Sequence, residues 1–178
     1  MTSTRHRLRK RNAFGWYRVR LLVRGDQRYD KARVLPGDRL VNVWVHWTEL
    51  QNDRNRLWSA NYCLYAYLHP KRDWLLYVGK AGGSTVRQRL SGDHKYQLFR
   101  DFKREYGIEG VRVLVGGLEL EEGRYRTSEL LADVESLLIK RLQPYGNRQA
   151  RSQRISRPGM RVHCVGAWPF NRSAFRDE

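Results

Sequence analysis

Two tyrosines and several cationic side chains are concentrated in the segment "LYAYLHPKRDWLLYVGKAGGSTVRQRLSGDH", residues 64–94. Tyr65 and Tyr77 belong to two apolar runs joined by the charged turn "HPKRD". The cationic side chains then follow in order: Lys80, Arg87, Arg89 and His94. Arginine and lysine beside tyrosine hydroxyls suit an anionic group such as a phosphate, for which arginine is a bidentate donor. A hairpin that needed only stability would have little use for this cluster.

A short helix is expected directly after the glycine-rich loop of this segment. The residues "TVRQRL" (85–90) favour a helix, with Ser84 or Thr85 as its N-cap. The first turn of a helix presents N–H groups that suit phosphate, and Arg87 or Arg89 would add a guanidinium there. The alternative interpretation is a basic surface helix.

A carboxylate at the border of an apolar helix face is the second candidate for chemistry. The residues 128–143 predict the clearest helix of the chain, and Pro144 ends it. Glu135 lies beside its leucine-rich stripe rather than on the solvated side. A carboxylate there costs free energy unless it is paired or binds a cation. Pairing with an arginine and binding of a metal ion are both open on this pattern.

The composition describes a basic globular protein that suits a polyanion. The chain has 178 residues, 40% of them hydrophobic, and a net charge of +17 with a pI of about 10.5. This charge favours nucleic acid as the partner. No membrane partner is expected, because the sequence has no apolar run of spanning length and no long basic amphipathic helix. The two cysteines, Cys63 and Cys164, lack metal-ligand spacing, and a cytoplasmic location is expected.

The excess charge lies towards the two ends of the chain. Residues 1–59 contain 14 basic and 5 acidic residues, 60–147 contain 14 and 11, and 148–178 contain 7 and 2. We therefore expect three parts: a basic N-terminal arm with a small β extension (1–59), a central domain (60–148) and an Arg-rich C-terminal extension (149–178). Nucleic-acid contacts are expected from Arg87, Lys95, Arg148, Arg151, Arg154 and Arg157.

The pattern of apolar residues predicts a mixed α/β fold, of the α+β type. Within the central domain the expected order is strand, strand, helix, helix, strand, helix. This order predicts a small antiparallel three-stranded sheet flanked by helices. The expected strands are 16–23, 40–47, 61–68, 74–80 and 111–120, with one more near 159–170, and the expected helices are 85–90, 96–106 and 128–143.

The joint order of these motifs resembles the GIY-YIG nuclease domain. "CLY" (63–65), "YVG" (77–79), an arginine-bearing helix and the segment "ESLLIKRLQPYGN" (135–147) match the signatures of that family, and "LYVGKA" (76–81) is similar to the nuclease domain of the UvrC family. The resemblance covers about residues 61–148. Cys63 stands where the first glycine of the motif is usual, and the loop after Lys80 is long, so the catalytic arginine is either Arg87 or Arg89, with Arg89 matching better.

The resemblance implies a metal-dependent DNA endonuclease. It assigns catalytic roles to Tyr65, Tyr77, Lys80, Arg89, His94, Glu135 and Asn147. Glu135 would hold one Mg²⁺ (or Mn²⁺) ion, and Tyr65 would act as general base or orient the attacking water. Arg89 would donate to the nonbridging phosphate oxygens, and Asn147 would orient Glu135 or the local backbone. Residue types alone do not establish these roles.

Two other functions are compatible with the same sequence. One is a catalytically inactive nucleic-acid-binding protein of the same fold, which binds DNA or RNA through its basic ends. The other is a small RNA-binding or ribosome-associated protein, in which six Trp and ten Tyr residues supply stacking surfaces. Within the nuclease interpretation the compact chain favours a restriction-type enzyme, which cuts two strands and would act as a homodimer on DNA.

Overall fold

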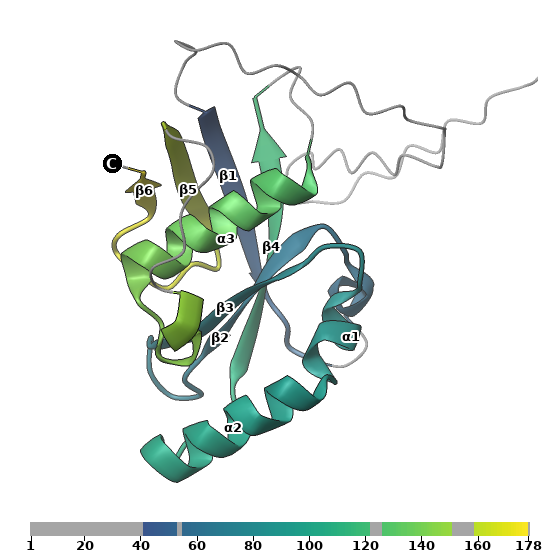
Figure 1. Cartoon of the computed structure of the whole chain (residues 1–178), viewed down its shortest axis with the longest axis vertical. Coiled ribbons are helices and arrows are strands. Elements are labelled where there is room, and N and C mark those ends of the chain that lie inside the picture. The colour runs from purple at the N-terminus through teal and green to yellow at the C-terminus, as the bar shows by residue number, and fades with distance from the viewer. Residues whose placement is uncertain (1–40, 53–54, 122–125, 151–158, 178) are drawn as a thin grey trace, which may run out of the picture. The chain divides into compact units, whose positions relative to one another are not determined.

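A computed structural model describes residues 41–52, 55–121, 126–150 and 159–177, all of them in the compact unit 37–178. A single β-sheet runs through this unit, with helices on both of its faces (Figure 1). The elements follow the chain as β1 (Val41–Glu49), η1 (Arg56–Ser59), β2 (Cys63–Leu68), β3 (Leu75–Ala81), α1 (Val86–Leu90), α2 (Asp93–Tyr106), β4 (Arg112–Leu120), α3 (Ser128–Leu142), η2 (Tyr145–Ala150), β5 (Met160–Gly166) and β6 (Ala174–Arg176).

The sheet has six strands in the order β3-β2-β4-β1-β5-β6. The antiparallel trio β3-β2-β4 forms one half of it, as the sequence predicted for the central domain. The predicted extent of the sheet was wrong, because β1 pairs antiparallel with β4 and parallel with β5, and β6 pairs antiparallel with β5. The mixed α/β class is confirmed.

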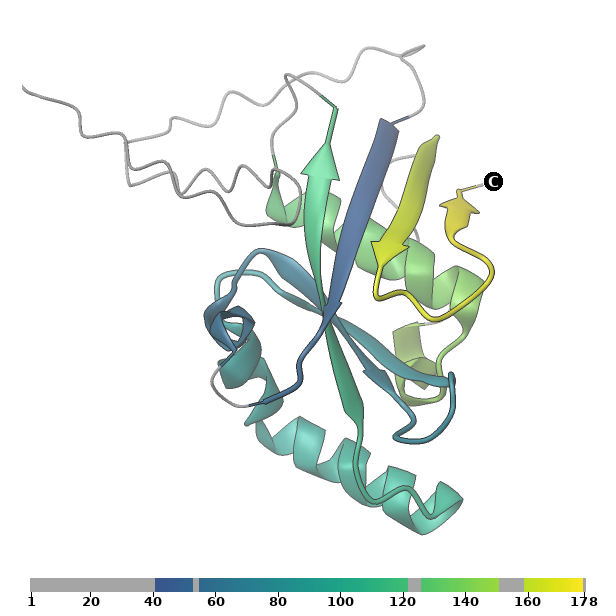
Figure 2. The same cartoon turned by 180° about the vertical axis from the view of Figure 1, so that it is seen from behind.

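The faces of the sheet are covered by different helices. Val43 and Val45 of β1, Leu64 of β2 and Val162 of β5 pack with the apolar side of α3 in one core. On the other face Tyr65, Tyr67, Leu76 and Val115 form a second core with α1 and α2. Because side chains alternate along a strand, a single strand such as β2 contributes to both cores. Seen from behind, β1, β5 and β6 lie in front of α3, and none of the helices with described placement crosses them on this side (Figure 2).

The N-cap expected at Thr85 and the helix stop expected at Pro144 are confirmed, and Thr127 is a further cap. Thr85 caps α1 in a reciprocal capping box with Gln88, and Thr127 caps α3 by accepting a hydrogen bond from the N–H of Leu130. At its other end α3 stops at Gln143, which adopts a left-handed conformation directly before Pro144. These two caps define the ends of α3, and Glu135 lies near the middle of the helix between them.

The regions outside the central domain are only partly described. The strand expected over 16–23 lies outside the described residues. The C-terminal region forms two strands, β5 and β6, where one was expected. Strands from all three predicted parts of the chain, residues 1–59, 60–148 and 149–178, belong to the same sheet. The proposed domain boundaries stay predictions. Within the described ranges, no helix combines the length and the apolar character that crossing a membrane requires.

Candidate active site

A cluster of tyrosines lies at the β3 edge of the sheet, on the face covered by α2. In the antiparallel pairing of β2 with β3, Tyr65 lies opposite Gly79 and Tyr67 opposite Tyr77. Residues opposite each other share a face, so the three rings are neighbours, with centroids 5.4–6.0 Å apart. A Cβ atom on Gly79 would lie 2.5 Å from Cζ of Tyr65 and 2.7 Å from Cε1 of Tyr77. The glycine therefore provides the space through which the Tyr65 ring reaches the edge of the sheet.

The tyrosine hydroxyls are held in their neutral form. Burial, followed by the neighbouring Tyr77 and Tyr67, raises the pKa of Tyr65 well above its usual value. Tyr65 donates a hydrogen bond to Tyr77, and burial and the charge of Glu135 raise the pKa of Tyr77 as well. A phenol in this environment donates or accepts hydrogen bonds more readily than it ionises. Of the two roles implied for Tyr65, the surroundings favour orienting a water molecule over acting as a phenolate base.

Lys95 is buried against the tyrosine rings. Its side chain is 1% exposed, and Nζ lies 3.3 Å from the ring centroid of Tyr77 and 5.4 Å from that of Tyr65. Burial lowers the pKa of Lys95 to about 7, with Arg89 acting in the same direction and Glu135 opposing it. The sequence had placed Lys95 among the solvent-facing nucleic-acid contacts. That placement is corrected, because its ammonium group faces the aromatic cluster inside the molecule.

Glu135 is joined to Lys80 across the edge strand. The Lys80 Nζ atom donates to Oε2 of Glu135 at 2.6 Å, and the carboxylate side chain is 14% exposed. Lys80 follows Gly79 in β3, so its side chain leaves the face opposite the tyrosines and meets α3. The predicted alternatives for Glu135 were an arginine partner and a metal ion. The partner in the described structure is a lysine, which the sequence had placed in the same site.

The two candidate arginines of α1 have different surroundings. Arg87 is exposed, with its guanidinium 5.6 Å from the ring centroid of Trp58. Arg89 is half-buried and close enough to lower the pKa of Tyr77 by its charge. Among the residues with described placement, no partner accepts from the buried Nε of Arg89. An inward guanidinium with unused donors is suited to a substrate oxygen, which favours Arg89 for the catalytic role.

Three amides at the N-terminus of α1 have partners within the protein. The N–H of Val86 donates to the carbonyl of Ala60 at 2.9 Å, and the N–H of Gln88 donates to Oγ1 of Thr85. The N–H of Arg89 donates to the carbonyl of Thr85. These bonds favour the Arg89 side chain over the backbone as the donor to an anion at α1.

Asn147 connects η2 to the edge of the sheet. Its Oδ1 accepts from the N–H of Val78 and its Nδ2 donates to the carbonyl of Val78, both at 2.8 Å. The side-chain amide thus pairs with β3 as a neighbouring strand would. Gly146 beside it lies so close to the carbonyl of Leu76 that a Cβ atom would be 3.0 Å away. Of the two roles expected for Asn147, these bonds correspond to holding the local backbone.

The remaining predicted residues lie outside this cluster or outside the description. Arg148 is exposed and donates to Glu105 at 2.6 Å and to the Tyr106 hydroxyl at 3.1 Å. His94 belongs to the first turn of α2, and its side chain is outside the described part of the structure. Three further arginines predicted to contact nucleic acid lie outside the described residues: Arg151, Arg154 and Arg157.

The residues at the β3 edge fit a loosely held hard cation. Within the described ranges, no group of three or more His, Cys, Asp or Glu side chains gathers to hold a metal ion. A single half-buried carboxylate, Glu135, is the donor that this site offers. Mg²⁺ is commonly held by one or two carboxylates together with water and substrate phosphate oxygens. The donor set fits that mode, provided that the Lys80 ammonium yields or shares Oε2.

Two residues of this site carry a signal that sequence reasoning did not use. Lys95 lies three, four and seven positions before Leu98, Phe99 and Phe102, so it continues their apolar stripe by one turn. Tyr67 lies two residues after Tyr65 and must share its face of the strand. Both positions were therefore recognisable as neighbours of the tyrosine cluster.

The chain was compared with known proteins at three levels. No protein-family model, no curated protein and no solved structure matches it.

Proposed function

We propose that this chain is a metal-dependent DNA endonuclease that hydrolyses phosphodiester bonds. The observation that carries the proposal is the convergence of Tyr65, Tyr77 and Arg89 with the Lys80–Glu135 pair at the edge strand β3. Glu135 lies far from the other four in the sequence, and all five are among the residues to which the GIY-YIG resemblance assigns catalysis. The net charge of +17 supports a polyanionic substrate.

Each side chain has a distinct task in the proposed reaction. The hydroxyls of Tyr65 and Tyr77 orient the attacking water, since their environment keeps both phenols neutral. The water oxygen bonds to phosphorus as the bond to the leaving oxygen breaks, and a proton of the water passes by way of a phosphate oxygen to the leaving oxygen. The Arg89 guanidinium donates to nonbridging oxygens as charge develops on the phosphate. Lys95, when protonated, places a cation against the rings of Tyr77 and Tyr65 and so holds them in position. Once Lys80 is released from Glu135, its ammonium group neutralises the charge that develops on the leaving oxygen.

Glu135 is the residue that would hold the divalent ion. A bound Mg²⁺ (or Mn²⁺) supplies Lewis-acid stabilisation of the phosphate and of the leaving oxygen. The chain's own contribution is to keep the carboxylate half-buried beside β3, where substrate oxygens complete the ligand set. We further propose a restriction-type role in which two copies act on the two DNA strands.

A plasmid assay tests the proposal. Supercoiled plasmid incubated with the purified chain and Mg²⁺ is expected to be nicked or linearised, and EDTA is expected to stop the reaction. Sequencing the ends produced from a random DNA pool would then give the cleavage preference. Absence of cleavage on every duplex and single-stranded substrate, with either Mg²⁺ or Mn²⁺, would contradict the proposal.

One observation favours the binding protein of the same fold as a second candidate. Lys80 already neutralises Glu135 at 2.6 Å, which is how a site that no longer binds a metal ion would be arranged. In that case DNA binding is unaffected by EDTA and no substrate is cut. The plasmid assay therefore separates the two functions.

A further inference from the structure

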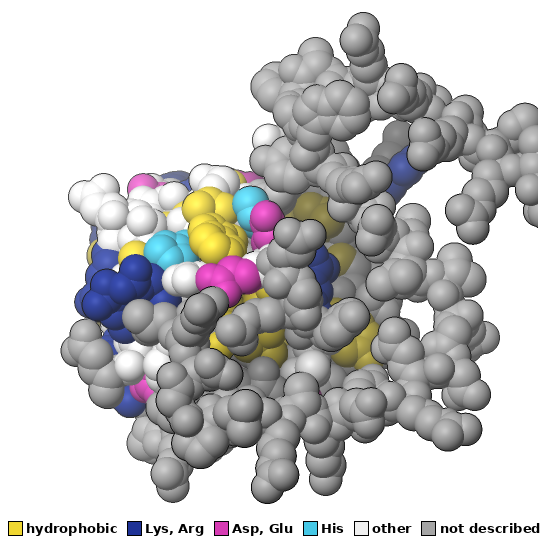
Figure 3. Space-filling view, turned by 90° about the horizontal axis from the view of Figure 1, so that it is seen from above, with side chains coloured by type: hydrophobic (Ala, Val, Ile, Leu, Met, Phe, Trp, Pro, Cys, Tyr) yellow, Lys and Arg dark blue, Asp and Glu magenta, His cyan; other side chains and the backbone are white. Residues whose placement is uncertain are grey.

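A basic pocket lies at the opposite edge of the sheet from the tyrosine cluster. It has a volume of about 300 Å³ and is formed by the end of α3 and by β5, β6 and the turn before β6. Its lining residues are Arg141, Arg161, His163, Arg172, Ala174 and Arg176. None of these described lining residues is acidic, so the pocket has a strong cationic character. From above, Lys and Arg side chains gather beside a histidine at one end of this face (Figure 3).

Two of these arginines are placed against each other by the strand register. In the antiparallel pairing of β5 with β6, Arg161 lies directly opposite Arg176, so both side chains leave the same face of the sheet. Like charges directly opposite each other destabilise a sheet. The buried Nε of Arg161 has no hydrogen-bond partner among the described residues. An anion bound here would offset the repulsion between the two guanidinium groups and would accept a hydrogen bond from Nε of Arg161.

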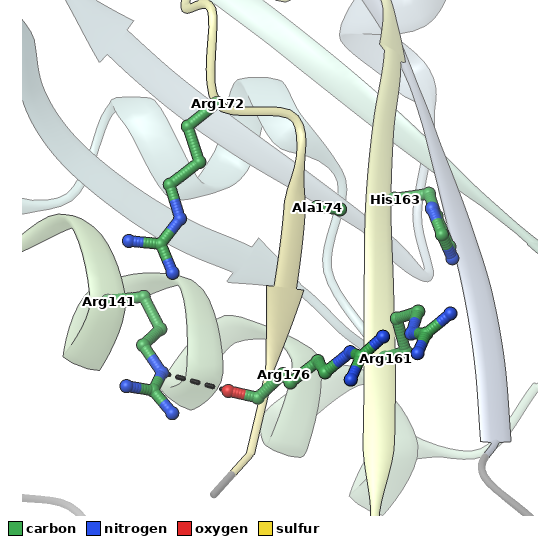
Figure 4. A pocket seen from close by; sticks show the side chains of 6 residues that line it. All are labelled: Arg141, Arg161, His163, Arg172, Ala174 and Arg176. Carbon is green, nitrogen blue, oxygen red and sulfur yellow. Dashed lines mark hydrogen bonds between the residues drawn. The ribbon is translucent and has the colours of Figure 1, made fainter.

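A third arginine is fixed at the rim by its own contact with the edge strand. Arg141 donates from Nε to the carbonyl of Arg176 at 2.8 Å, which orients its guanidinium along β6. Figure 4 shows Arg141 and Arg172 on one side of β6, with Arg161 and His163 on the other. The nearby carboxylate of Asp177 does not line the pocket, and its Oδ1 lies 3.6 Å from Nζ of Lys140. The arginines are thus held around β6 by backbone contacts and strand pairing.

We propose that this pocket binds a backbone phosphate of nucleic acid, away from the phosphate that is cleaved. The choice of duplex DNA as the ligand rests on the proposed function. Glu135 of the candidate active site and Arg141 of the pocket both belong to α3, so one helix joins the two sites. Bound at the pocket, the duplex would be positioned without the pocket taking part in the chemistry.

Arginine suits this task because the pocket would contact the phosphate oxygens of the duplex and not its bases. Guanidinium groups form bidentate hydrogen bonds with phosphate. Contacts of this kind set affinity and register, and they make binding depend on salt. The pocket is accordingly expected to contribute to all duplexes alike, whatever their sequence.

The test measures duplex binding in EDTA, where cleavage is stopped, by fluorescence anisotropy at several salt concentrations. The double variant Arg161→Gln/Arg176→Gln is expected to bind a 20-bp duplex about 10-fold more weakly, and the slope of log K against log salt is expected to fall by about 1. The matched control is Arg72→Gln/Arg104→Gln, which removes the same charge from two exposed arginines, one in the β2–β3 turn and one in α2. It is expected to change affinity less than 3-fold.

Thermal unfolding checks that any loss is not a loss of folding. Because the Arg161–Arg176 repulsion is removed, the double variant is expected to melt at the same temperature as the wild type or higher. Wild-type affinity and an unchanged salt slope in the folded double variant would overturn the inference. So would an equal loss in the control pair.

The outcome is separable from that of the proposed function. If the arginine variants lose duplex binding but no substrate is ever cleaved, the pocket is a nucleic-acid site and the nuclease proposal fails. If cleavage occurs and duplex affinity is unchanged in the arginine variants, the pocket inference fails alone. The inference would also be overturned if unlabelled single-stranded RNA abolished the difference in affinity between the wild type and the double variant and unlabelled duplex DNA did not.

Discussion

The Nζ atom of Lys80 lies 2.6 Å from Oε2 of Glu135, across the edge strand of the sheet. One residue comes from the glycine-rich end of the β2–β3 hairpin, and the other leaves α3 fifty-five positions later in the chain. The pair brings together the two parts of the sequence to which catalysis was assigned. It also makes Lys80 the residue that controls access to the candidate metal ligand.

Replacement of this lysine is expected to reduce cleavage more than stability. Lys80→Met removes a cationic donor from the phosphate site, and we expect a loss of about 10²-fold in the cleavage rate. The partly exposed ion pair contributes only about 1 kcal/mol to the free energy of unfolding. Single-turnover cleavage and urea unfolding measure the two effects. The control is Lys71→Met at an exposed position of the hairpin turn, and equal cleavage by both variants would contradict the role of Lys80.

Gly79 is expected to tolerate no side chain. Gly79→Ala places a methyl group 2.5 Å from Cζ of Tyr65, so the ring must move away from the sheet edge. The expected cost is about 1–3 kcal/mol in the free energy of unfolding, with a loss of cleavage. Gly83→Ala is the control, because nothing lies within 4 Å of its Cβ position. Adding Tyr65→Leu to Gly79→Ala is expected to restore part of the stability, because the contact with Cε1 of Tyr77 at 2.7 Å stays, but not cleavage. Recovery of cleavage would contradict the role of Tyr65.

The amide of Asn147 is expected to be needed as both donor and acceptor. Asn147→Asp keeps the bond from the N–H of Val78 but sets a carboxylate oxygen against the Val78 carbonyl. We expect a loss of about 2 kcal/mol in the free energy of unfolding at pH 7. The loss is expected to shrink near pH 4, where the protonated carboxyl can donate again. Urea unfolding at both pH values checks this, with Asn171→Asp as the exposed control, and a pH-independent loss would contradict it.

Lys95 is expected to make stability depend on pH. Its pKa is about 7 in the folded chain and 10.5 in its ordinary state, so between these values the unfolded chain binds a proton that the folded chain does not. The free energy of unfolding therefore rises with pH across this window, by about 1 kcal/mol per pH unit. Below pH 7 both states are protonated and the slope disappears.

The variant Lys95→Met tests this assignment. It is expected to flatten the rise between pH 7 and pH 10, as measured by urea unfolding at each pH. Lys71→Met, at an exposed position, is expected to leave the rise intact. An unchanged slope in Lys95→Met would show that the buried ammonium is not the titrating group.

Local patterns predicted the elements of the central domain. The alternation around Tyr65 and Tyr77, the N-cap at Thr85 and the stop at Pro144 are visible in short windows, and the structure has β2, β3, α1 and the end of α3 there. The catalytic arginine was predicted only as one of two alternatives, Arg87 or Arg89, with Arg89 matching the resemblance better. A helix of five residues does not determine by its pattern which arginine faces inward.

Long-range pairing was not predictable in the same way. β1 lies between β4 and β5, and its parallel partner β5 is more than one hundred residues away in sequence. Strand neighbours at this separation are selected by the whole core and not by the periodicity of either segment. The burial of Lys95 was missed for a different reason: its spacing from Leu98, Phe99 and Phe102 puts it on the apolar stripe, but a lysine is ordinarily assigned to solvent.

The central claim is tested most directly by comparing Glu135→Gln with Glu129→Gln. Both substitutions remove one carboxylate from α3, but Glu135 pairs with Lys80 of the edge strand β3, whereas Glu129 is in the exposed first turn. Single-turnover cleavage of a labelled duplex in Mg²⁺ is the measurement, with duplex affinity determined separately in EDTA. We expect Glu135→Gln to cleave at least about 10²-fold more slowly than the wild type, with unchanged affinity, and Glu129→Gln to cleave normally. Cleavage by Glu135→Gln at the wild-type rate would contradict the assignment of Glu135 and of the site built around it.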